Sequence, residues 1–174
     1  MPSDLSLLAR RPVAVTVGGR KFSLPYRSAA EWASALESLE FLVTSLADDE
    51  VRAAIVDMHI ARTPVREDLK NEALRILEQE GGRKWWEVGR LLSTSVSTEV
   101  LGHLVLSGVD PWNRSVGEWC AAVYALCLKN QDERGRMKFE FSLSLPPRGY
   151  EAECDDGNDI ASLSQAYAQA LGKK

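Results

Sequence analysis

The sequence predicts a mainly helical α+β domain, with five to six helices and a small antiparallel sheet. Residues 11–26 alternate between apolar and polar positions around a double glycine, which is typical of a β-hairpin. Residues 28–128 carry apolar side chains at the three- and four-residue spacing of amphipathic helices. Residues 137–145 alternate again, which predicts a late strand beside the hairpin.

The length and composition of the chain limit the number of domains and the kinds of partner to expect. The chain has 174 residues, of which 45% are hydrophobic, enough for one domain with a core. We expect this α+β domain to span residues 1–150, and residues 151–174 to form an acidic linker and a flexible or weakly helical tail. The net charge of −4 argues against nucleic acid as a partner. The sequence begins with no apolar run typical of a signal peptide or membrane span, so a cytosolic protein is expected.

The predicted hairpin begins the fold. Gly18 and Gly19 supply the positive φ angles of a tight turn, and Pro25 limits the second strand. The apolar side of the hairpin comprises Val13, Val15, Val17, Phe22 and Leu24.

Two helices are predicted next. Ser28 and Glu31 have the spacing of a capping box, and the apolar stripe that follows continues to about Leu46. Asp48 or Asp49 caps the second helix, whose expected inward residues are Val51, Ile55, Met58 and, less clearly, Val56.

The third and fourth helices are separated by a double glycine. Thr63 is the expected N-cap of the third helix, and Pro64 occupies its first position. Gly81 and Gly82 end that helix. The fourth helix then continues to about Ser93.

A fifth helix is predicted from Thr98 to Ser107, ended by Gly108. A turn containing Asp110-Pro111 follows, and Ser115 with Glu118 forms a second capping box. The helix after that box has a broad apolar face and is expected to be deeply buried.

The late strand is predicted from a period of two. Lysine, glutamate and serine alternate with the apolar side chains, and Pro146-Pro147 ends the run. Its expected buried face comprises Met137, Phe139, Phe141, Leu143 and Leu145. We expect this strand to pair with the hairpin, since an isolated hairpin is only marginally stable.

No residue pattern points to catalysis, a metal or a cofactor. His59 and His103 have no partner at ligand spacing, and the serines of residues 93–97 lack the glycines of a nucleophile elbow. Residues 155–159 resemble part of a calcium loop but lack its glycine register and closing glutamate. A binding or structural protein is therefore favoured over an enzyme.

The three cysteines do not suggest a disulfide. Cys120 and Cys127 are seven residues apart in a predicted helix, which separates their Cα atoms by about 10 Å. Both are expected to be buried thiols, and Cys154 an exposed thiol among acidic residues.

The tryptophans supply the candidate partner-binding residues. On a helical wheel Trp85 faces the core, whereas Trp86 lies at the polar boundary, one turn from Arg90, which is placed to stack on its ring. Trp86 is either a lid over the core or an exposed contact for a partner, and both alternatives stay open. Trp112 follows Pro111 in a turn. The candidates are therefore Trp86, Arg90 and Trp112.

The order of these features resembles one known family. The stretch VTVGGRKFSLPY is followed by RKWWEVGRLL, then by HLVLSGVDPWNRSVGEWCAAVYAL and finally by KFEFSLSLPPRG. This series, over about residues 11–149, is similar to the tail assembly chaperones of long-tailed actinobacterial phages. The resemblance rests on the order of the motifs, because none contains a catalytic residue.

The resemblance implies a function and partners. A protein of this family coats the long tape measure protein in the host cell cytoplasm before the tail tube polymerises around it. Further implied partners are the tail tube protein and a frameshifted longer form of the chaperone itself. The codons of Leu171-Gly172-Lys173 allow a slippery run of bases, which the nucleotide sequence of the gene tests. The alternative function is a structural virion component, such as a minor tail or head–tail connector protein.

Overall fold

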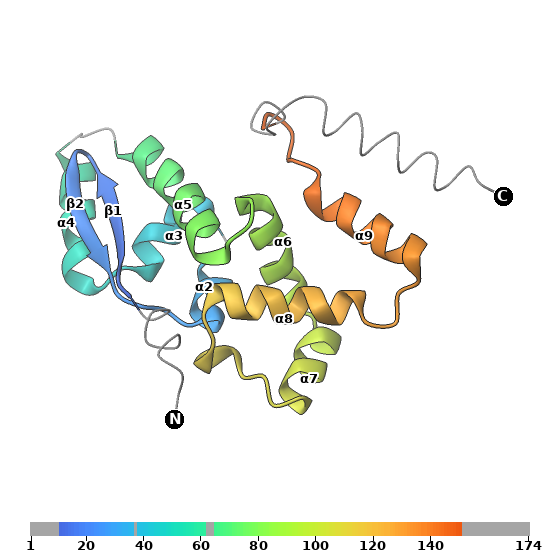
Figure 1. The fold of residues 1–174 in the computed structure, drawn as a ribbon. Helices are drawn as coiled ribbons and strands as arrows, with labels where there is room; N and C mark the ends of the chain where they lie inside the picture. The colour runs from blue at the N-terminus through green and yellow to red at the C-terminus, as the bar shows by residue number, and fades with distance from the viewer. Residues whose placement is uncertain (1–10, 37, 62–64, 151–174) are drawn as a thin grey trace.

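The computed structural model describes residues 11–36, 38–61 and 65–150. Within these ranges the chain forms eight α-helices, one short 3-10 helix and a two-stranded antiparallel sheet (Figure 1). The elements in chain order are β1 (Val13–Val17), β2 (Arg20–Leu24), α2 (Ala29–Ala35), α3 (Leu39–Leu46), α4 (Asp49–Ile60), α5 (Arg66–Gly81), α6 (Trp85–Ser95), α7 (Thr98–Leu106), η1 (Pro111–Asn113), α8 (Val116–Leu128) and α9 (Glu133–Ser144). The α+β class is confirmed, with more helices than the five to six expected.

The N-terminal hairpin is confirmed. Val13 pairs with Leu24 at one end and Val17 with Arg20 at the other. The turn places Gly18 and Gly19 at φ angles of 56° and 75°, which only glycine adopts readily. The backbone N–H of Gly18 donates to Oδ2 of Asp68 on α5 at 2.7 Å, so the hairpin is anchored to a helix.

Both capping boxes form as predicted. The Ser28 side chain accepts from the Glu31 backbone at the start of α2, and Ser115 and Glu118 repeat the arrangement at α8. Asp48 caps α4. The predicted sites at Thr63 and Pro64 lie outside the described residues, and α5 begins at Arg66.

The single helix expected from Ser28 to Leu46 is wrong, because the chain breaks it into α2 and α3. Ser38 has extended backbone angles, φ −149° and ψ 127°. This break turns α3 so that it packs along α5, and it buries Leu42 as well as Val43. Leu42 lies at the edge of the apolar stripe expected for a continuous helix, and the packing of α3 on α5 buries it fully.

The late strand is also wrong, since residues 133–144 form helix α9. The side chain of Asp132 caps the helix by accepting from the backbone N–H of Gly135 at 2.7 Å. On this helix Phe139 and Leu143 share a face and pack on the core, whereas Met137 is only half-buried. The sheet of the described residues therefore contains only the hairpin strands, and α9 lies at the end of the molecule opposite them (Figure 1).

The core lies between α5, α6 and α8, and α2 and α3 close one side of it. Trp32 and Trp119 are buried there, as their apolar stripes predict. In the described ranges, every helix is too short or too polar to cross a lipid bilayer. Residues 151–174 lie outside the described ranges, so the linker and tail stay a prediction, as does the exposed thiol of Cys154.

The state of the α8 cysteines gives a first testable result. Cys120 is buried, Cys127 is half-buried, and both are free thiols. Burial raises the pKa of the Cys120 thiol to about 12, so this thiol stays protonated and unreactive at pH 8 while the protein is folded. We expect a thiol reagent at pH 8 to modify Cys120 only after guanidinium is added, as peptide mass mapping would show. Rapid modification in the native state would contradict the packing of α8.

Candidate functional site

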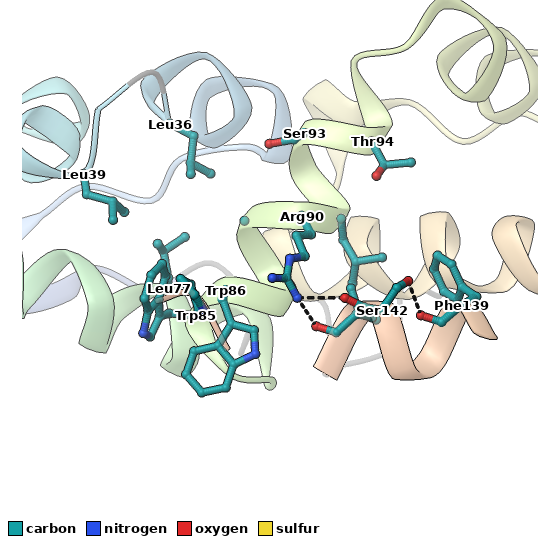
Figure 2. Close-up of a pocket in the computed structure, with 14 residues that line it drawn as sticks. Leu36, Leu39, Leu77, Trp85, Trp86, Arg90, Ser93, Thr94, Phe139 and Ser142 are labelled. Carbon is teal, nitrogen blue, oxygen red and sulfur yellow. Dashed lines mark hydrogen bonds between the residues drawn. The ribbon is translucent and has the colours of Figure 1, made fainter. Parts of the chain in front are cut away.

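A largely apolar groove of about 490 Å³ lies between α6, α9 and the α2–α3 connection (Figure 2). Helix α6 supplies its floor with a run of residues that begins at the paired tryptophans. Its lining residues are Leu36, Leu39, Leu77, Trp85, Trp86, Gly89, Arg90, Leu91, Ser93, Thr94, Phe139, Ser142, Leu143 and Pro147. The groove therefore brings together two of the three predicted partner-binding residues, Trp86 and Arg90.

Trp86 is a buried structural residue as well as a wall of the groove. Its side chain is 3% exposed, and its Nε1–H donates to the backbone oxygen of Ser144 at 3.1 Å. Its ring meets the ring of Trp85 edge to face, with centroids 5.7 Å apart. Of the two alternatives for Trp86, the lid over the core matches the structure, and the polar boundary position expected from the wheel is wrong.

Arg90 binds the last turn of α9. Its Nη1 donates to the backbone oxygens of Ser142 at 2.9 Å and Leu143 at 2.7 Å (Figure 2). A cation at a helix C-terminus satisfies free carbonyls and opposes the negative end of the helix dipole. The cation over the Trp86 ring is instead Lys84, with Nζ 5.9 Å from the ring centroid. The expected stacking of Arg90 on Trp86 is thus replaced by a bond to α9.

Trp86 and Arg90 together form what we name the α9 clamp. Between them they hold three consecutive carbonyl groups, those of residues 142–144, at the C-terminal end of α9. The clamp fixes one wall of the groove against its floor. Sequence patterns gave no sign of it, because α9 itself is not recognisable as a helix from its period of two.

Trp85 lines the groove and also carries a buried hydrogen-bond donor. Its side chain is 9% exposed, and the ring of Tyr150 packs edge to face on it at 5.0 Å. Among the buried side-chain nitrogen and oxygen atoms of the described residues, Nε1 of Trp85 is the one without a hydrogen-bond partner. An unsatisfied buried donor costs about 1–3 kcal/mol of stability.

Trp112 lies apart from the groove. It belongs to η1, which packs against α2, and its side chain is 65% exposed. It lines a separate cleft of about 400 Å³ together with Arg27, Glu31 and Arg52. The structure therefore does not unite Trp112 with Trp86 and Arg90.

Two further apolar surfaces were missed by the sequence analysis. One is a cleft of about 420 Å³ between α3, α4 and α5, where Phe41 and Val56 are exposed. The other is the outer face of α7, where Leu101, Val105 and Leu106 are exposed. Val56 points outward, contrary to expectation. The sequence did contain a sign of these surfaces: α4 and α7 carry apolar residues on more than one side. A helix that packs on the core through one face leaves the apolar residues on its other sides exposed.

The histidines of the described residues lie at the surface. His59 and His103 are both exposed, and no three histidine, cysteine, aspartate or glutamate side chains gather there as metal ligands. The residues resembling a calcium loop, 155–159, lie outside the described ranges. Comparison of the chain with models of protein families, with curated proteins and with solved structures finds no match.

Proposed function

We propose that this chain is a phage tail assembly chaperone that binds the tape measure protein and keeps it soluble in the host cell cytoplasm during tail tube assembly. The observation that carries the proposal is the apolar groove between α6 and α9. An amphipathic helix binds another protein by laying its apolar face into such a groove. The resemblance of residues 11–149 to phage tail chaperones supports the same partner.

In the proposed mechanism, many copies of the chain bind the tape measure protein, each through a weak contact. A tape measure protein is a long chain with helical apolar stripes, which aggregate when they meet each other in water. Many copies of a small acidic protein cover those stripes, and the net charge of −4 per copy keeps the complex soluble. Tail tube subunits then displace the copies one at a time. A frameshifted longer form of the chain is a further proposed partner in this coat.

The second candidate is a structural virion component, such as a minor tail or head–tail connector protein. The exposed residues Leu101, Val105 and Leu106 on α7 favour it, because permanent neighbours in an assembly cover apolar surface of this kind. Mass spectrometry of purified virions separates the two candidates. A chaperone is nearly absent from the virion, whereas a structural component is present at a fixed copy number.

A groove-blocking variant tests the proposed function. Thr94 lines the groove and is exposed, so Thr94→Trp fills the groove without disturbing the core. We expect the wild-type chain to keep a co-expressed tape measure fragment soluble and to co-purify with it in several copies. Thr94→Trp is expected to weaken this binding at least tenfold, by about 1.4 kcal/mol or more per site.

Ala121→Trp is the matched control, because Ala121 is exposed on α8 and does not line the groove. Equal binding by both tryptophan variants would assign the contact to another surface. A tape measure fragment that stays insoluble beside the wild-type chain would count against the function itself.

A further inference from the structure

The described fold ends beside the groove. Pro147 lines the groove, and three residues later the ring of Tyr150 packs on Trp85. The backbone N–H of Tyr150 donates to the oxygen of Pro147 at 3.1 Å, and Gly149 adopts the positive φ of 89° within this turn. Residues 151–174 therefore start at the edge of an apolar surface.

The segment after this point carries an apolar stripe at helical spacing. Ile160, Leu163, Tyr167 and Leu171 are separated by three, four and four residues. In a helical conformation these side chains fall within about 80° of one another around the axis, over a length of about 17 Å. Serine, glutamine and alanine occupy all of the remaining positions from 161 to 170. Such a narrow stripe suits a groove rather than a broad core.

The nine residues 151–159 are long enough to bring the stripe to the groove. An extended chain of nine residues reaches about 30 Å. Five of these residues are acidic, and none is basic. This linker is therefore long enough to reach the groove, and it carries a strong negative charge.

Four basic side chains lie in or near the groove, and we name them the basic rim; Arg90 is the one that lines the groove itself. Lys84 is exposed at the start of α6, and Lys70 lies with its Nζ 5.6 Å from the centroid of the Tyr150 ring. Arg90 uses only Nη1 in hydrogen bonds to described residues, so its Nε and Nη2 donors stay available. Arg148 is also exposed, three residues before the acidic linker starts. Acidic linker and basic rim complement each other at short range.

We propose that residues 160–171 dock as a helix into the groove between α6 and α9 of their own chain, with the acidic linker of residues 151–159 along its basic rim. The apolar stripe covers the exposed edges of Trp85 and Phe139. The segment thereby occupies the surface that the proposed function gives to the tape measure helix. The docked segment would thereby compete with the tape measure protein, and this regulatory role rests on the proposed function. The docking itself does not rest on it.

The full-length protein tests the docking through its tryptophan indole signals. A nitroxide is attached at Gln169→Cys, on the side of the segment away from the stripe, in a chain that also carries Cys127→Ser and Cys154→Ser. Cys120 stays in place because it is buried. We expect the indole N–H signals of Trp85 and Trp86 to lose more than half of their NMR intensity. The Trp112 signal serves as a control within the same molecule, because Trp112 does not line the groove.

Two pairs of substitutions on the segment check that the stripe makes the contact. Leu163→Asp with Tyr167→Asp is expected to restore the Trp85 and Trp86 signals. Ser162→Asp with Gln165→Asp, on the opposite side of the same helix, adds the same charge and leaves the signal loss unchanged. Equal signal loss at Trp85, Trp86 and Trp112, or no loss at any of them, would overturn the proposal.

A mixing experiment decides whether the occupant comes from the same chain. Nitroxide-bearing protein without isotope is mixed with isotope-labelled protein without nitroxide. We expect no signal loss in this mixture. Loss at Trp85 and Trp86 in the mixture would show that a second copy supplies the segment, which contradicts docking within one chain. No tape measure fragment is present in any of these samples, so their outcome is separate from that of the proposed function.

Discussion

Replacing Trp86 with alanine is expected to lower the free energy of unfolding by about 3–5 kcal/mol. The side chain is 3% exposed and packs on Trp85, so its removal leaves a large cavity at the base of the groove. The change also removes the donor that Ser144 uses at the end of α9. Since small domains are stable by only about 5–15 kcal/mol, this variant stands close to unfolding.

Denaturant unfolding followed by circular dichroism measures the effect. Trp86→Phe separates the two contributions, because it keeps much of the buried ring and removes the Nε1–H donor. It is expected to cost less than the alanine variant. Trp112→Ala is the matched control, since its ring is 65% exposed, and it is expected to change stability by less than about 0.5 kcal/mol.

The opposite result has a clear meaning for function. If Trp86→Ala unfolds at the wild-type denaturant concentration and binds a tape measure fragment tenfold more weakly, Trp86 is a partner contact. That outcome would contradict the burial of its ring in the structure and restore the second alternative of the sequence analysis.

The elements that local chemistry determines were predictable from the sequence. The Gly18-Gly19 turn and the capping boxes at Ser28 and Ser115 depend on residues close together in the chain, and all three form as expected. The end of α5 at Gly82 follows from a glycine with a φ of 64°. In each case the signal and the structure involve the same few residues.

Elements that depend on packing between residues far apart in the chain were not predictable from local sequence. The break at Ser38 has no glycine or proline to mark it, and it exists because α3 packs on α5. The alternation of residues 137–145 suits a strand, but the strand would need a partner edge. The end of α9 instead finds its partners in Trp86 and Arg90, more than fifty residues earlier in the chain.

Two of the three candidate residues, Trp86 and Arg90, lie together in the groove, whereas the role of each was not predictable from the sequence. Trp86 and Arg90 stand out in the sequence as an aromatic and a cation one helical turn apart, and both line the groove. The helical wheel cannot show that a second helix covers that side of α6. Burial of Trp86 and the hydrogen bonds of Arg90 therefore follow from α9, which the sequence analysis placed in a sheet.

Leu143→Ala is expected to destabilise the protein by about 2–5 kcal/mol, whereas Met137→Ala costs about 1 kcal/mol or less. The two side chains have similar size. In helix α9 Leu143 is 5% exposed and belongs to the core, while Met137 is only half-buried and faces another direction. A strand with a period of two would place both side chains on the same buried face and give them similar costs.

Denaturant unfolding of the two alanine variants therefore distinguishes a helix from a strand at residues 133–144. Backbone chemical shifts of the wild-type protein give an independent measurement, and we expect helical values throughout this range. Equal destabilisation by both variants, together with chemical shifts typical of extended backbone, would show that residues 133–144 form a strand and not helix α9. It would also remove the wall of the groove, since Phe139, Ser142 and Leu143 reach it only because the chain is helical there. The geometry of α9 thus decides whether the groove exists for any partner.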